Sequence, residues 1–286
     1  MILPSTKKIK QLELIANKTR RLVIDSLYHA GSGHPGGSLG MADVFTSLYF
    51  YVLKHNPKKP LLKERDRLVL SNGHICPVQY ASLALSGYFP IKELKTLRKI
   101  NSRLQGHPHR TSLPGIETTS GPLGEGLSQA IGIALAAKMD KENYYVYCLS
   151  SDGEHQEGNQ WEAAMLAGKN KLSNLIQIID RNHIQISGFT EDVLPLEPLK
   201  EKYLSFNWNV LEINGNNIKA IIETVFKAKR EKDRPTVIIA KTVPGMGVSF
   251  MENDYKWHGK APSKEEAQKA IAELKALQKM IKHKKN

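Results

Sequence analysis

The sequence predicts an α/β fold in which a mostly parallel sheet is flanked by helices on both faces. Short apolar runs rich in Val, Ile and Tyr alternate along the chain with longer segments of helical periodicity. Apolar strands that alternate with helices favour a parallel sheet covered on both faces. With 286 residues, 41% of them hydrophobic, the chain is large enough to bury a sizeable core in one large domain.

The periodicity places each element in turn. We expect helices at 9–28, 41–53, 77–86, 91–99, 127–139, 160–169, 218–229 and 264–282. The last of them starts with Ser263 and Glu266 in the spacing of a capping box. We expect strands at 144–149, 174–180, 208–213 and 236–240. The chain then divides into a domain at 1–260 and a C-terminal helix with a basic tail at 261–286.

The formal net charge of +13 indicates a solvated basic surface. Residues 261–286 hold seven Lys and three acidic residues, which account for +4 of the excess. No arginine cluster or aromatic stripe points to nucleic acid, whereas an acidic partner or a phosphorylated substrate would suit the charge. Cys76 and Cys148 form no CxxC pair, no signal peptide is recognisable, and no apolar run approaches the roughly 18 residues of a membrane span. We therefore expect a cytoplasmic protein that binds neither nucleic acid nor membrane.

Polar residues follow two neighbouring strands, where ligands of open α/β sheets bind. Residues 152–158 (DGEHQEG) follow the strand at 144–149, and residues 180–184 (DRNHI) end the next one. An Asp-Gly pair alone is often only a tight turn. A carboxylate, an amide and a backbone carbonyl from adjacent strand ends, however, suit a hard cation that also takes oxygens from diphosphate and water. The pairing resembles the thiamine diphosphate signature, with Ser151 in the place of its usual first glycine.

A glycine-rich segment, 120–126 (SGPLGEG), leads into the helix expected at 127–139. Its Gly-x-x-Gly-x-Gly spacing is not that of a dinucleotide fingerprint, and no apolar strand precedes it. A loop of this kind at a helix N-terminus suits phosphate or close backbone contact with a ligand. A purely structural turn remains the alternative.

Four histidines stand in loops dense in Gly and Pro: His34, His74, His107 and His258. Neutral imidazoles near pH 7 can accept and donate protons and can bond sugar hydroxyls. The other six histidines lack such settings, and we assign them to the surface or the core. The absence of an HExxH motif argues against zinc.

Taken in order, these motifs resemble those of transketolases over residues 9–270. They are SGHPG at 32–36, RDRLVLSNGH at 65–74, GHP at 106–108, LPGIETTSGPLG at 113–124, DGEHQEG at 152–158 and WHG at 257–259. The resemblance implies the diphosphate-binding domain of a thiamine diphosphate enzyme. It also implies the transfer of a two-carbon ketol unit from a ketose or ketose phosphate to an aldose or aldose phosphate.

The resemblance also implies residue roles. Asp152, Asn182 and the carbonyl of Ile184 would bind Mg²⁺ or Ca²⁺ on the cofactor diphosphate. The cofactor itself would contact His74, Gly121, Leu123, Gly153, Asn182, Lys241 and His258. The residues implied in sugar binding and proton transfer are His34, His107 and His258, whereas Glu157 would belong to a carboxylate network that links two active sites.

Transketolases hold the pyrimidine ring and the sugar phosphate in a further domain that normally follows this one. We therefore expect the partner to be a separate C-terminal transketolase subunit, and we expect self-association and a heterotetramer. The sugars and the pathway stay open between pentose phosphate interconversion and a specialised biosynthesis.

Two enzyme alternatives share the Asp-Gly to Asn signature, namely the α-type subunit of a 2-oxoacid dehydrogenase and a half of a deoxyxylulose-phosphate synthase. Neither is expected to carry His34, His107 and the WHG segment. A regulatory protein that kept the fold without turnover is a further alternative, and the intact metal and histidine set argues against it.

Overall fold

The computed structural model describes residues 2–284 and confirms the predicted α/β fold. Its main sheet has five parallel strands in the order β1-β2-β3-β7-β6. The strands are β1 (Arg67–Leu70), β2 (Val146–Ser151), β3 (Leu175–Arg181), β6 (Asn209–Asn214) and β7 (Thr236–Lys241). Four of them lie at the positions expected from the sequence. The unexpected one, β1, has only four residues and starts with an arginine, which is too short for a recognisable pattern.

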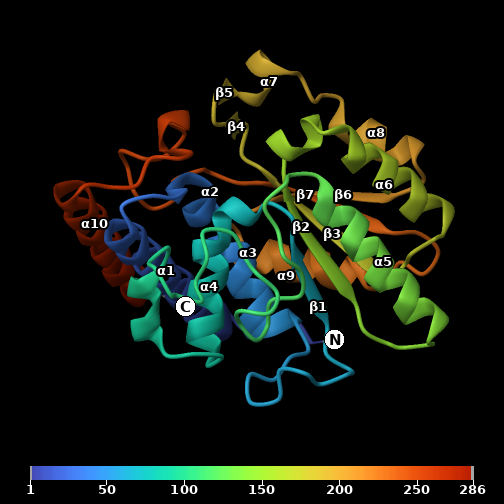
Figure 1. Ribbon diagram of the computed structural model, residues 1–286, viewed down its shortest axis with the longest axis horizontal. Coiled ribbons are helices and arrows are strands. Elements are labelled where there is room, and N and C mark those ends of the chain that lie inside the picture. The colour runs from blue at the N-terminus through green and yellow to red at the C-terminus, as the bar shows by residue number, and fades with distance from the viewer. Residues whose placement is uncertain (1, 285–286) are drawn as a thin grey trace.

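Helices cover both faces of the sheet (Figure 1). One face is packed by α1 (Thr6–Ala30), α3 (Ala42–Ser47), α4 (Cys76–Ser86) and α9 (Ile218–Ala228), with α10 (Lys264–His283) alongside α1. The other face is packed by α5 (Glu125–Met139), α6 (Gly158–Lys169) and α8 (Leu199–Ser205).

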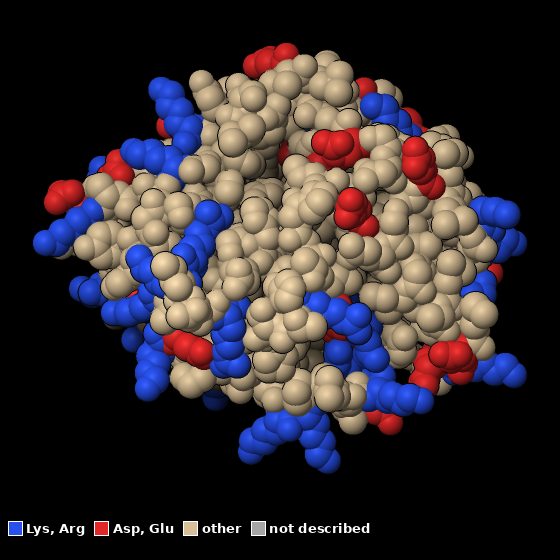
Figure 2. Space-filling view, in the orientation of Figure 1, with Lys and Arg blue, Asp and Glu red and all other residues tan. Residues whose placement is uncertain are grey.

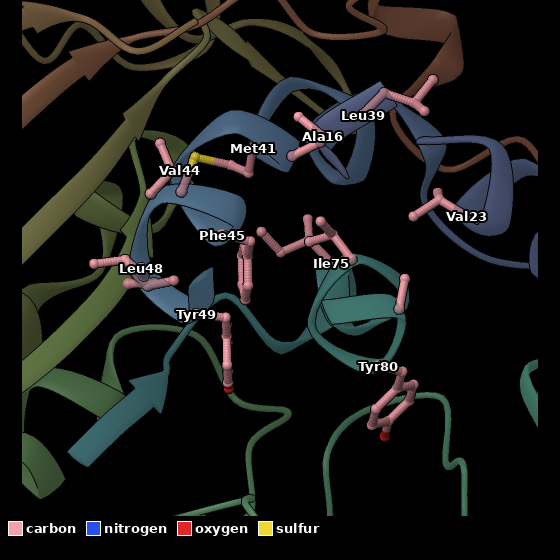
Figure 3. Packing of buried hydrophobic residues seen from close by; sticks show 14 of the residues in the cluster. Ala16, Val23, Leu39, Met41, Val44, Phe45, Leu48, Tyr49, Ile75 and Tyr80 are labelled. Carbon is pink, nitrogen blue, oxygen red and sulfur yellow. The ribbon is translucent and has the colours of Figure 1, made fainter. Parts of the chain in front are cut away.

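The two layers enclose separate apolar cores because side chains of a strand alternate between faces. In β3, Ile176 and Ile178 belong to the first core, whereas Leu175 and Ile179 belong to the second. Figure 3 shows the first core, where Phe45 and Tyr49 lie close to Ile75 and other apolar side chains. The sheet is therefore buried on both faces, as its continuous apolar strands predict.

Some expected helices take other forms. The segment at 41–53 is α3 followed by a π-helical turn, η1 (Leu48–Val52), and the segment at 91–99 is a 3₁₀ helix, η3 (Ile91–Thr96). Short elements that the periodicity did not indicate are α2 (Pro35–Gly40), α7 (Thr190–Val193), α8, and the hairpin of β4 (Ile184–Gln185) and β5 (Gly188–Phe189). Most of these span only one or two turns, so no full helical period shows in the sequence.

The last helix is confirmed together with its start signal. The Ser263 side chain accepts a hydrogen bond from the Glu266 backbone, and the Glu266 side chain accepts one from the Ser263 backbone, which completes the capping box. Ala267, Ala270 and Leu274 are buried against the first core. Within residues 2–284, no helix is long and apolar enough to cross a membrane.

A matched pair of helical glycines tests this packing. A Cβ on Gly168 of α6 would overlap the carbonyl oxygen of Phe206, whereas one on Gly132 of α5 would meet nothing within 4 Å. We expect Gly168→Ala to lower the free energy of unfolding by about 3 kcal/mol, since backbone must move. Gly132→Ala should raise it by about 0.5–1 kcal/mol through helix propensity. Urea unfolding measures both, and equal effects of the two substitutions would contradict this packing.

Candidate active site

The loops at the carboxyl ends of the strands surround one cleft of about 380 Å³. It is lined by His34, His74, His107, Gly121, Leu123, Ser151, Gly153, Glu154, Gln156, Glu157, Ile184, Gln185, Ile186 and His258. These residues come from segments far apart in the sequence, and the parallel strands bring them to one edge of the sheet. The volume is in the range of small-molecule sites.

Three histidines from separate loops meet at the cleft. His34 precedes α2, His74 lies in the 3₁₀ turn η2 (Gly73–Ile75), and His258 follows η5 (Tyr255–Trp257). Their ring centroids lie 5.0 Å (His34 to His74), 5.5 Å (His34 to His258) and 5.1 Å (His74 to His258) apart.

The histidines of the cleft are neutral near pH 7. Burial lowers the pKa of His34 to about 4, and the neighbouring His258, Arg98 and His107 act on this pKa in the same direction. Burial also lowers the pKa of His74 well below its usual value, and it lowers those of His107 and His258. The buried Nδ1 of His34 has no hydrogen-bond partner among residues 2–284. These rings can therefore donate or accept hydrogen bonds toward a ligand without carrying charge.

Asp152 and Asn182 form a buried corner beneath the cleft. The Asp152 carboxylate accepts hydrogen bonds from the backbone N–H of Gly153 at 2.8 Å and of His183 at 2.6 Å. The Asn182 side-chain oxygen accepts one from the backbone N–H of Ile184 at 3.0 Å. Burial raises the pKa of Asp152 to about 6, against the effect of a neighbouring arginine and the backbone donors.

The donor set of this corner fits a divalent cation that shares a diphosphate. Within residues 2–284, no group of three or more His, Cys, Asp or Glu side chains is arranged to hold a metal. One carboxylate, one amide and the nearby carbonyl of Ile184 therefore leave most coordination positions to the ligand and water, which is the pattern of Mg²⁺ on phosphates. Both side-chain polar atoms of buried Asn72, next to the His74 turn, also lack hydrogen-bond partners in the part of the chain that the structure describes. Gly121 has no atom within 4 Å of its missing Cβ, so a ligand can approach its backbone.

Lys241 lies apart from the cleft. Its ammonium group pairs with Glu212 of β6 at 3.1 Å, its side chain is 62% exposed, and it is not among the residues that line the cleft. The role that the resemblance implies for Lys241 remains a prediction. Glu157, in contrast, lines the cleft together with the histidines.

Arg181 is a residue of this site that the sequence did not single out. Its guanidinium is buried and donates to Asp152 at 3.1 Å, to Thr190 at 3.0 Å, and to Glu191 and Glu197 at 2.7 and 2.8 Å. It thereby ties the Asp152 corner to the segment that follows the β4–β5 hairpin. Arg181 belongs to the motif at 180–184, but the sequence does not show its partners. Three of them lie at 190–197, and they reach Arg181 only in the folded chain.

A second such residue is Glu154, a fully buried carboxylate that accepts hydrogen bonds from the Ser71 hydroxyl and from the backbone N–H groups of Gly124 and Ser151. A third is Asp180, which accepts from Thr242 and from the Asn182 amide. Burial raises the pKa of Asp180 to about 7.

Charged side chains are unevenly distributed around the site. Figure 2 shows Lys and Arg gathered along the left and lower edges of this face, a largely uncharged middle, and several acidic side chains right of centre. Among the residues that line the cleft, only Glu154 and Glu157 are of a charged type other than histidine. The residues that line the cleft therefore include none of the Lys and Arg side chains behind the net charge of +13.

The comparisons with known proteins agree with one another. A family model described as transketolase, thiamine diphosphate binding domain, matches residues 11–279. The chain is 42% identical over 267 residues to an apulose-4-phosphate transketolase subunit from Phocaeicola vulgatus, with 93% of this chain and 95% of that one covered. It is 43% identical over 259 residues to the 6-deoxy-6-sulfo-D-fructose transketolase subunit SqwG of Clostridium sp. strain MSTE9, with 91% and 94% covered.

Among solved structures, the transketolase of Campylobacter jejuni is similar with a TM-score of 0.87 and 39% identity. The match covers 92% of this chain and 42% of that one, so the chain spans less than half of that transketolase. Since the family model matches nearly the whole chain and the motif residues meet in one cleft, the chain belongs to the transketolase family and forms its thiamine diphosphate binding domain.

Proposed function

We propose that this chain is the cofactor-binding subunit of a two-subunit transketolase that uses thiamine diphosphate with Mg²⁺. Together with a separate C-terminal subunit it would transfer a two-carbon ketol unit from a ketose phosphate to an aldose phosphate. The observation that carries the proposal is the convergence of four neutral histidines on a cleft above the Asp152–Asn182 corner.

Asp152, Asn182 and the carbonyl of Ile184 would hold the cation, with Ca²⁺ as an alternative to Mg²⁺. The Asp152 and Asn182 side chains are held by backbone N–H groups around them, so the corner is preorganised for a small hard ion. His74, His258 and the backbone at Gly121, Leu123 and Gly153 would contact the diphosphate and the thiazole.

Bound thiamine diphosphate supplies an electron sink for carbon–carbon bond cleavage. The task of this chain is to orient the substrate and to move protons. His34 and His107 lie at the cleft and are neutral, so each can hold a sugar hydroxyl and accept its proton near pH 7. Glu157 would connect the site to a second active site through carboxylates.

The division into two subunits is supported by the relatives. Those named as transketolase subunits are matched over 94–99% of their own length. A heterotetramer on a two-fold axis is the simplest closed assembly of two such subunits with two partners. The substrates in the names of these relatives, apulose 4-phosphate and 6-deoxy-6-sulfo-D-fructose, favour a specialised sugar over the pentose phosphate pathway. The free, buried Cys76 and Cys148 suit the cytoplasm.

The cation corner can be tested with Asp152→Asn. We expect the affinity for thiamine diphosphate with Mg²⁺ to fall roughly 100-fold or more, because a buried charge that holds the cation is lost. Isothermal titration calorimetry measures this, with circular dichroism to verify folding. Asp192→Asn, the same change on an exposed residue, serves as the control. Wild-type affinity in a folded Asp152→Asn protein would refute the proposal that Asp152 holds the cation.

The histidine roles predict two different phenotypes. His107→Ala should lower ketol transfer by about 10²–10⁴-fold and leave cofactor affinity close to wild type, since His107 would act on the sugar. His74→Ala should weaken cofactor binding instead. Turnover at saturating cofactor and calorimetric affinity separate the two, and identical phenotypes would contradict the division of roles.

The two-subunit proposal predicts that ketol transfer needs a partner. The purified chain should not convert a ketose phosphate alone, and a C-terminal transketolase subunit should restore turnover when mixed with it. Light scattering should then report a two-plus-two assembly, whose obligate interface would bury more than about 2,000 Å². Full turnover by the chain alone would overturn the two-subunit proposal.

A further inference from the structure

We propose that Glu154 is a positioning residue that fixes three separate backbone segments of the cofactor site against one another. The segments are the end of β1 with the His74 turn, the glycine-rich loop at 121–126, and the end of β2 with Asp152. That these segments form a cofactor site rests on the proposed function. The contacts of Glu154 with them are observed in the structure.

Each carboxylate oxygen of Glu154 binds a different part of the site. Oε1 accepts hydrogen bonds from the backbone N–H of Gly124 at 2.7 Å and from the Ser71 hydroxyl. Oε2 accepts one from the backbone N–H of Ser151 at 3.1 Å. The Ser71 hydroxyl in turn accepts from the backbone N–H of Gly126 at 3.0 Å. One side chain therefore connects segments that are up to 83 residues apart in the sequence.

The arrangement replaces a missing helix cap. Gly124 is the N-cap of α5, and no side chain of its own caps the helix. The first N–H groups of a helix have no partners within the helix, and they carry partial positive charge that favours an anion. Glu154 and Ser71 satisfy the N–H groups of Gly124 and Gly126 from across the site. The buried carboxylate is thus compensated by backbone donors.

The glycines permit this approach and fix its geometry. Gly124 has φ +83°, and a Cβ there would overlap the side chain of Asn159. A Cβ on Gly126 would overlap the side chain of Ser71. The loop can therefore reach Ser71 and Glu154 only without side chains at these positions. Since Gly121 and Leu123 of the same loop line the cleft, their placement follows from the Glu154 contacts.

Glu154→Gln tests the proposal with little change in volume. Whichever way the new side-chain amide is oriented, its NH₂ group points at the backbone N–H of Gly124 or at that of Ser151. That backbone N–H then has no acceptor. In the full chain we expect amide hydrogen exchange at 121–126 or at Ser151 to accelerate about 10- to 100-fold, since a charge-assisted hydrogen bond is lost. With a C-terminal transketolase subunit present to allow turnover, the apparent KM for thiamine diphosphate should rise about 10-fold or more, with kcat at saturating cofactor little changed.

Trp208→Phe is the matched control. It removes a buried hydrogen bond, from the Trp208 indole to the Ala164 carbonyl at 2.9 Å, within the second core. A purely structural role for Glu154 predicts that both variants change cofactor KM and exchange at 121–126 only in proportion to their loss of global stability. That result, or wild-type exchange and KM in Glu154→Gln, would overturn the proposal.

Ser71→Ala provides a second variant should Glu154→Gln fail to fold. It leaves the Gly124 and Ser151 contacts and removes the acceptor for Gly126, so we expect faster exchange at Gly126 and a smaller rise in cofactor KM. Unchanged exchange at Gly126 would refute the network. If the wild-type chain does not bind thiamine diphosphate even with a C-terminal transketolase subunit present, the proposed function fails, whereas the exchange measurements still decide the role of Glu154.

Discussion

The site depends on the parallel register between β2 and β3. In this register Ser151 pairs with Asp180, and the backbone N–H of Asp152 donates to the carbonyl of Asp180 at 3.2 Å. Asp152 and Asn182, thirty residues apart in the sequence, therefore leave the sheet side by side. A slip by one residue would turn the side chains of one strand to the opposite face. Close packing of the β3 side chains in both cores opposes such a slip, because each shifted side chain would enter a space shaped for another.

The same edge of the sheet holds several buried carboxylates. Hydrogen bonds from backbone N–H groups offset part of the free energy that it costs to bury their charge. Asp152, Glu154 and Asp180 are almost completely buried, and burial raises the pKa of each carboxyl group. Backbone N–H groups, hydroxyls and the guanidinium of Arg181 provide their partners. Buried ionic groups of this kind contribute little net stability compared with apolar packing. Their concentration at one edge of the sheet is better explained by ligand binding than by folding.

The sequence predicted the parts of this protein that leave a periodic or local signal. Four strands, the long helices and the capping box follow from residues close together in the chain. The cleft histidines could be predicted because their motifs resemble those of a known family. The roles of Glu154 and Arg181 could not be assigned, because their partners meet them only in the folded chain. Glu154 bonds Ser71, 83 residues away, and Arg181 bonds Asp152, 29 residues away. Lys241 had a motif position, yet its side chain pairs with Glu212 instead of facing the cleft.

The distribution of charge limits which parts of a substrate the cleft-lining residues can bind. The described residues that line the cleft include no Lys or Arg, and their histidines are neutral near pH 7. Under the proposed function, a cation held at Asp152 and Asn182 would neutralise the diphosphate. An anionic group at the far end of a bound sugar would have no such counter-ion among the cleft-lining residues, and Glu157 would repel it. Positive charge for that end of the substrate must then come from outside the cleft-lining residues, either from Arg98 of this chain, which lies close to His34 and His107, or, under the proposed function, from the partner subunit.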